Sequence, residues 1–379
     1  MNKIIKGLIL AVLICSVILF FLPPTNVFNG QQPSPSKKPF TKPLQETTLP
    51  TKFATSSANE NVTTISDGEA SEQSDLIIDC NATLEQSTDI SDDKIADFRL
   101  YLQHSGSADD QLAYLLFGSQ SPNEDQFAAL QSYNKTFPKN KRVLMDLIGL
   151  CSANYHHKYC NDKLLNQAIE LDGNNAALWL QISNFHAAKQ DTQATLHAME
   201  NAINATGFND YYYDNLALFM QTSKGTLDVS FSQRAIMGLG YHAATPVWVS
   251  SISSFCFDEA NYSDLRNQLC LALGKTIATQ SNSLIINAIG LNMQSLAYKR
   301  EQNEAMQLKA EKEKAELMQG PTNTDIQFKA KVLSLVDEQL FNYWLNNVIN
   351  LGEAKADELL VEEAITLSKN PDYAPCPKE

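Results

Sequence analysis

Two consecutive stretches of equal length decide the fold: residues 142–175 read RVLMDLIGLCSANYHHKYCNDKLLNQAIELDGNN, and residues 176–209 read AALWLQISNFHAAKQDTQATLHAMENAINATGFN. Small residues recur at matching places of the two stretches: Gly149 and Ser183, then Ala168 and Ala202. Small side chains let two helices cross closely, whereas Trp179 and Met199 are large enough to fill the space between neighbouring helix pairs. The pattern therefore predicts two helical hairpins in tandem.

The 34-residue period resembles the tetratricopeptide repeat, a pair of antiparallel helices with small and large residues at fixed places. The sequence departs from the family pattern at three positions, where Gly173 replaces a closing proline, His186 a tyrosine and Thr195 a small alanine. A third unit is expected from Asp210 and a degenerate one before Pro138. The resemblance implies an all-α solenoid of stacked helix pairs; the alternative is a different helix-pair array.

The resemblance also implies a binding surface, because the first helix of each pair lines a concave face that holds peptides or partner proteins. We therefore expect a protein or peptide partner, with Asn184 and two aspartates as its polar anchors. The residues carried over to this face are Asp146, Asn154, Leu180, Asn184, Tyr211 and Asp214.

The amino terminus predicts a membrane anchor. Lys3 and Lys6 precede an uncharged apolar run that continues to Leu22. Residues 4–22, about 19 in number, would span about 28 Å as a helix, close to the hydrocarbon thickness of a bilayer. Since lysines stay in the cytoplasm, we expect a single-pass protein of the cytoplasmic membrane whose bulk is extracytoplasmic, in the periplasm. A cleaved signal peptide is the alternative, but no clean small-x-small site follows the run.

Composition predicts three further parts. Residues 23–75 hold seven of the 14 prolines together with Ser, Thr and Gln, which is typical of a disordered linker. Residues 76–245 are expected to form the repeats, and residues 246–379 a C-terminal helical region. In that region we predict a helix pair over 247–255 and 263–277, long helices over 281–318 and 325–351, and a last helix over 354–368. The charged segment 298–318 is a solvated face or, alternatively, a coiled-coil surface.

Six cysteines besides Cys15 suggest three disulfides, as expected outside the cytoplasm. Sequence proximity favours Cys151–Cys160 and Cys256–Cys270, which leaves Cys80 and Cys376 as the third pair. A zinc site made by Cys151, Cys160, His156 and His157 is the less favoured alternative, because adjacent histidines rarely point at one ion.

The sequence indicates no reaction. It lacks the G-x-S-x-G, Walker, G-x-G-x-x-G and H-E-x-x-H motifs, so we expect no cofactor, no metal site and no enzyme. A net charge of −14 argues against a nucleic-acid partner. The main hypothesis is a binding scaffold. The alternatives are an all-helical hydrolase of an envelope polymer, which would need a deep acidic cleft, and a structural subunit of a membrane assembly.

Overall fold

The computed structural model describes residues 77–80, 90–118, 123–243, 255–257, 263–319 and 324–376. Every regular element within these ranges is a helix, which confirms the all-α class, and the only bridge joins Asn175 to Gly207. None of the helices described is both long and apolar enough to cross a membrane. The predicted span over residues 4–22 and the predicted linker over 23–75 lie outside the described ranges.

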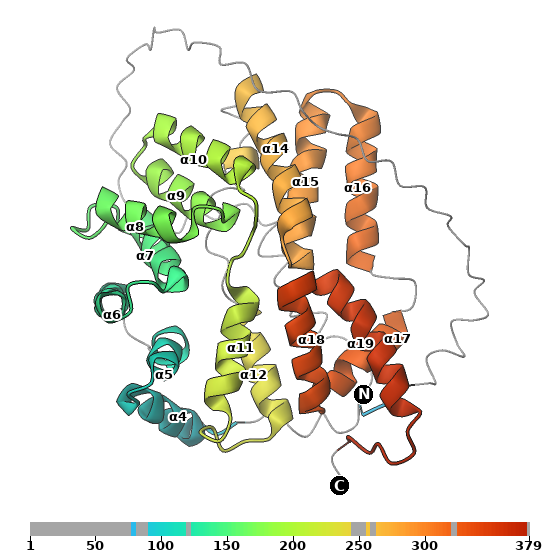
Figure 1. Ribbon diagram of the computed structural model, residues 1–379. Helices are drawn as coiled ribbons and strands as arrows, with labels where there is room; N and C mark the ends of the chain where they lie inside the picture. Colours follow the sequence, from blue (N-terminus) through green and yellow to red (C-terminus); the bar gives the residue numbers. More distant parts are fainter. Residues whose placement is uncertain are drawn as a thin grey trace, which may run out of the picture. The chain divides into compact units, whose positions relative to one another are not determined.

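The helices follow one another as labelled in Figure 1. In order they are α4 (Asp92–His104), α5 (Ala108–Ala113), the π-helical turn η1 (Tyr114–Gly118), α6 (Asn123–Thr136), α7 (Lys141–Ala153), α8 (Asp162–Asp172), α9 (Ala176–Ala188), α10 (Thr192–Asn204), α11 (Tyr212–Ser223), α12 (Phe231–Ala243), α14 (Asp264–Gln280), α15 (Leu284–Arg300), α16 (Glu304–Gln319), α17 (Thr324–Ser334), α18 (Glu338–Leu351) and α19 (Glu353–Ser368).

Polar side chains define where the helices α7 to α10 begin. Asn140, Asn161, Asn175 and Asp191 precede α7, α8, α9 and α10, and each accepts a hydrogen bond from a backbone N–H of the first turn. Such N-caps satisfy donors that have no partner inside the helix. Regular capping explains why the boundaries of these helices follow the sequence pattern closely.

The two hairpins α7–α8 and α9–α10 are present but unequal. The first pair is joined by eight residues, 154–161, and the second by three, 189–191. Cys160 lies in the longer connection, because α8 begins only at Asp162. At the crossing of α9 and α10, the Ser183 hydroxyl donates to the Thr195 carbonyl at 3.4 Å, as expected for a small residue at a close approach.

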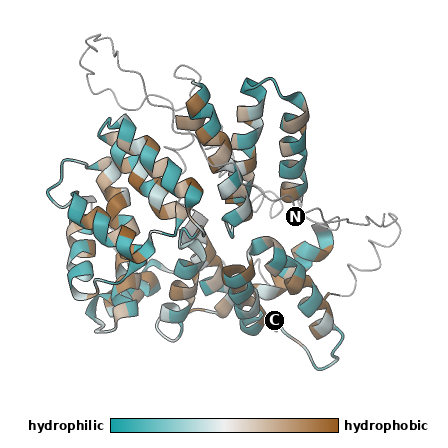
Figure 2. Ribbon diagram, turned by 45° about the horizontal axis from the view of Figure 1, so that its top comes forward, coloured by the Kyte–Doolittle hydropathy of each residue, from teal (hydrophilic) through white to brown (hydrophobic). Residues whose placement is uncertain are grey.

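Two hydrophobic cores draw residues from every helix named above except α16, and all of these helices belong to one compact unit. The first core joins residues of α6–α10 to residues of α14 and α15. The second joins residues 77–80, α4, α11 and α12 to α17–α19. Each core therefore draws from both sides of position 245, the domain boundary expected from the sequence. Figure 2 shows hydrophobic and hydrophilic residues alternating along the helices, as amphipathic packing requires.

The two long C-terminal helices expected from the sequence are each broken in two, so those predictions were wrong. Residues 281–318 form α15 and α16, separated at Gln302, whose φ of 57° is left-handed. Residues 325–351 form α17 and α18, separated where Asp337 caps the second helix. In both cases amphipathic periodicity continues across the turn, so hydrophobic spacing alone could not reveal the break. Because α16 folds back on α15, residues 298–318 form no single coiled-coil helix.

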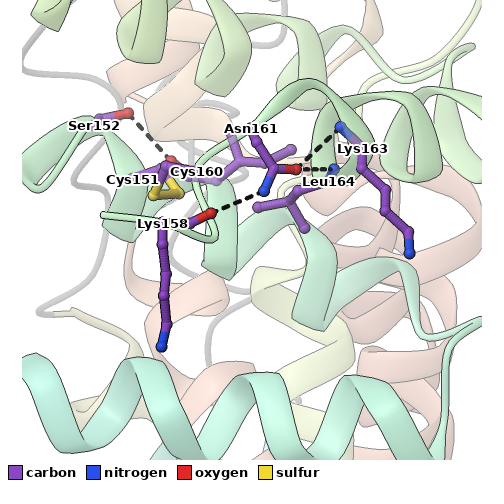
Figure 3. Close-up of a disulfide and its surroundings, with 8 residues drawn as sticks. Cys151, Ser152, Lys158, Cys160, Asn161, Lys163 and Leu164 are labelled. Atoms are coloured by element: carbon purple, nitrogen blue, oxygen red, sulfur yellow. Dashed lines mark hydrogen bonds between the residues drawn. A yellow bond between two sulfur atoms is a disulfide. The ribbon is translucent and has the colours of Figure 1, made fainter. Parts of the chain in front are cut away.

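The six cysteines lie in three pairs at disulfide distance, in the pairing that sequence proximity favours. The S–S distances are 1.92 Å for Cys80–Cys376 and 2.01 Å for both Cys151–Cys160 and Cys256–Cys270. Beside the first pair, the Ile78 N–H donates to Ser368 Oγ at 3.1 Å, so the start of the unit lies against the end of α19. Figure 3 shows the second pair at the connection between α7 and α8.

Candidate functional site

The expected concave face does not exist as an open surface at α9. Leu180 is fully buried and Asn184 is 6% exposed, so neither side chain lies on an open surface in this structure. The physical reason is that α9 packs against α7, α8 and α10, which leaves nine of its 13 residues buried. The expected role of these two residues in binding a partner stays a prediction.

Asn154 caps the carboxyl end of α7 and begins the connection that the Cys151–Cys160 bond closes. Within this loop the His157 ring packs 4.3 Å from Phe127 and 5.1 Å from Tyr159, measured between centroids. Among the described residues no group of three or more histidine, cysteine or acidic side chains could hold a metal ion, and Cys151 and Cys160 are bonded to each other.

Asp146, Tyr211 and Asp214 do come together, in a polar junction around Arg142. The Arg142 Nε donates to Asp146 at 2.8 Å, and its Nη1 donates to the Asp210 carbonyl at 3.0 Å. The guanidinium carbon also lies 5.9 Å from the centroid of the Tyr211 ring. Asp214 joins through Asn209, whose amide donates to it at 3.1 Å.

Asp172 and Asn175, which the sequence did not single out, connect the side chains of this junction. The Tyr211 hydroxyl donates to Asp172 at 2.8 Å, and Lys141 forms a 3.2 Å ion pair with the same carboxylate. Asn175 donates to the Asn209 carbonyl and accepts from the Asn209 N–H, at 2.8 and 2.9 Å. Burial, reinforced by Asp172, raises the pKa of Tyr211, so its hydroxyl remains a neutral donor. Because these polar side chains already have partners within the protein, the polar junction stabilises the fold.

A small cavity lies beside the polar junction, where the two hydrophobic cores meet. It is lined from one side by Phe208 and Asp210 and from the other by Asn282 and Ile349. Its volume of about 20 Å³ has room for about one water molecule. Burial raises the pKa of the Asp210 carboxyl, opposed by the Tyr212 N–H and Arg142. Although acidic, this cavity cannot take a sugar ring and is no polymer-binding cleft.

A larger groove lies on the layer formed by α14, α15 and α16, which stand side by side in Figure 1. The volume of the groove is about 290 Å³, close to the lower end of ligand sites at about 300 Å³. The central helix α15 contributes to it together with both of its neighbours. The lining residues are Lys275, Ala278, Thr279, Asn287, Leu291, Gln294, Glu313 and Leu317.

Close contacts join the three helices of this layer. At Gly290 an added Cβ would lie 2.6 Å from the Ala278 backbone nitrogen, so α14 and α15 are in backbone contact there. Gln294 then donates to the Gly274 carbonyl at 3.2 Å. On the other side, Ser295 donates to Glu311 and Lys314 to Asn292, each at 2.9 Å. The walls of the groove are thus tied to its floor by direct contacts.

The outer wall, α16, is the most open of the three helices. Ala310 is buried against α15, whereas Leu308 is 65% and Met318 52% exposed. The Lys309–Glu313 and Lys312–Glu316 pairs lie along the exposed surface of the helix. The sequence signal for this location was the Lys- and Glu-rich segment itself, which marks a solvated face but not the groove beside it.

Comparisons with protein-family models, with curated proteins and with solved structures find no match for this chain. The groove and the polar junction therefore have to be interpreted from their own geometry.

Proposed function

We propose that this protein is a membrane-anchored, extracytoplasmic helical scaffold that binds a partner protein or peptide, and that it binds this partner in the α14–α16 groove. The observation that carries the proposal is the groove itself. It combines an apolar floor at Leu291 with polar rims, and its volume suits a few side chains better than a complete small molecule.

The extracytoplasmic location is supported by two features. The predicted span over residues 4–22 follows basic residues that favour the cytoplasm. The three cysteine pairs at disulfide distance are of a kind that persists in oxidising compartments and is rare in the cytosol. A phosphatase that is active only outside the cytoplasm, fused to the carboxyl terminus, tests this part; an inactive fusion would contradict it.

We also propose that α7–α10 are two degenerate tetratricopeptide-like repeats. The alternation of hairpins, the packing of α7 on α9 and the close crossing at Ser183 support this class. In this protein the repeats act as a support. Their first core includes residues of α14 and α15, so they hold the groove-forming layer in place.

Blocking the groove tests the binding proposal. Peptides of 18 random residues displayed on phage are selected on the full chain in detergent, and their affinities are measured by fluorescence anisotropy. Thr279 is exposed on the groove wall, so Thr279→Trp is expected to fill the groove and weaken binding at least tenfold. Ala305→Trp, on the exposed surface of α16 outside the groove, is the matched control. Equal loss in both variants, or loss in neither, would remove the groove as the site.

A further inference from the structure

The floor of the groove is one face of a helix. Asn287, Leu291 and Gln294 are spaced by four and three residues, which places them in one row along α15. The α14 and α16 walls run alongside this row. A groove of this shape can accept a row of side chains from another helix, since the side-chain ridges of one helix pack into the grooves of its neighbours. A peptide that binds by adding a strand to the edge of a sheet finds no such edge here, because the described part of the chain contains no strand.

The two walls carry opposite charges. Lys275 is exposed on the α14 wall, and Glu313 on the α16 wall has a side chain that is 47% exposed. Glu313 forms its own ion pair with Lys309 at 3.8 Å, which is a weak, solvated contact. Both charges can therefore serve a partner.

Contacts with α15 show where the two charges lie along the groove. The Lys275 Nζ lies 5.9 Å from the centroid of the Tyr298 ring, and Tyr298 continues the row of Asn287, Leu291 and Gln294 by four residues. The Ser295–Glu311 and Asn292–Lys314 bonds place Glu313, which lies between their α16 partners, beside the part of α15 nearer the middle of this row. The two charges thus stand on opposite sides of the floor, with Lys275 nearer the carboxyl end of α15.

From this placement, which rests on the function proposed above, we infer that the groove takes an amphipathic α-helix of a partner protein, with an apolar ridge for Leu291, an acidic side chain on the flank that faces Lys275 and a basic side chain on the flank that faces Glu313. Complementary flanks of this kind set specificity and register more than raw affinity.

Three synthetic helices with one common apolar ridge test the inference on the full chain in detergent. One peptide has an acidic and a basic flank, one has two basic flanks, and one has two acidic flanks. This design works in either docking direction, because reversing a helix only exchanges its flanks. The wild type is expected to bind the mixed peptide roughly fivefold more tightly than the others, as for partly exposed charge pairs.

Reversing the charge on one wall of the groove should change which of the three peptides binds most tightly. Lys275→Glu makes both walls acidic and should prefer the peptide with two basic flanks. Glu313→Lys makes both walls basic and should prefer the peptide with two acidic flanks. Lys312→Glu and Glu316→Lys, on α16 outside the groove lining, are matched controls that should leave the order unchanged. A thermal melt of each variant shows that the fold is intact.

The outcomes separate this inference from the function on which it depends. Binding that Thr279→Trp abolishes, without any preference among the three peptides, would overturn the charged-helix partner and leave the groove as the site. A wild type that binds none of the peptides and forms a dimer in detergent, with Thr279→Trp monomeric, would make a second copy of this chain the occupant and also overturn the inference. Failure of every peptide with a monomeric chain would contradict both.

Discussion

The helices α9 and α16 are both regular, but α9 is enclosed by its neighbours and α16 is open to solvent along most of its length. In α9 even Gln181, Ser183 and Asn184 are buried, whereas in α16 the apolar Leu308 is 65% exposed. Residue type alone would assign the opposite environments. The difference shows that the number of helices packed around an element decides how much of its surface is accessible, and this number is a property of the complete fold.

The largest expected effect concerns the enclosed helix. Leu180 is fully buried in the first core, so Leu180→Ala should lower the free energy of unfolding by about 2–5 kcal/mol through lost burial and the cavity left behind. Leu308→Ala on α16 removes an equal number of atoms from a mostly exposed site and should change the free energy by less than about 0.5 kcal/mol. Chemical denaturation measures both; similar losses would end the distinction between the two helices.

The disulfide beside the enclosed helix should come next. Cys151 is buried in the same core as α9, and its bond to Cys160 closes a short loop. Replacing both cysteines by alanine should cost about 2–3 kcal/mol, because the unfolded chain gains freedom. Denaturation of the double variant under non-reducing conditions, compared with the wild type, measures this loss. A free energy of unfolding equal to that of the wild type would show that the Cys151–Cys160 bond does not stabilise the fold.

The next prediction concerns the crossing of α14 and α15, and it tests whether these two helices are closely packed beneath the groove. Gly290→Ala places a Cβ 2.6 Å from the Ala278 nitrogen and should destabilise the protein by roughly 1–3 kcal/mol. Gly240, in α12, has no atom within 4 Å of an added Cβ, so Gly240→Ala should stabilise the protein by about 0.5–1 kcal/mol. Opposite shifts of the melting temperature are expected; shifts of the same sign would contradict the close crossing.

A smaller effect is expected at Asp210, which lines the small cavity between the two hydrophobic cores. Burial raises the pKa of this carboxyl above its ordinary value of 3.8, so the fold favours the protonated form. The stabilising contribution is complete below pH 3.8 and is lost as the pH rises through the raised pKa. Asp210→Asn should therefore stabilise the protein at neutral pH and remove this part of the pH dependence. Unfolding curves from pH 4 to 8 check the slope, and an unchanged slope would assign it to another group.

The smallest expected effect concerns the charges on the open surface. Lys312→Glu removes an exposed ion pair with Glu316, in which both side chains are more than 60% exposed. The free energy of unfolding should fall by no more than about 0.5 kcal/mol. A loss above 1 kcal/mol would show that α16 is held by more than its contacts with α15.

The sequence predicted the helical class, the two hairpins and the cysteine pairing, because caps, amphipathic spacing and short chain separations are local signals. It could not predict that nine of the 13 residues of α9 are buried, since that depends on how α7, α8 and α10 pack around it. The groove was also missed, because its lining comes from three helices that only their mutual packing brings together. Asp172 and Asn175 follow each other closely at the end of α8, and only the fold brings them to their distant partners Tyr211 and Asn209.

The bond between Cys80 and Cys376 makes the chain from one to the other a closed covalent ring, with 296 positions of sequence separation between its ends. A pull between the segment before Cys80 and the residues after Cys376 would pass through the two sulfur atoms and bypass the helices between them. Neither end of the unit could then separate from the other while the bond is intact. Under the anchoring proposed above, the segment from the membrane would join the folded unit at the point where its two ends are covalently linked.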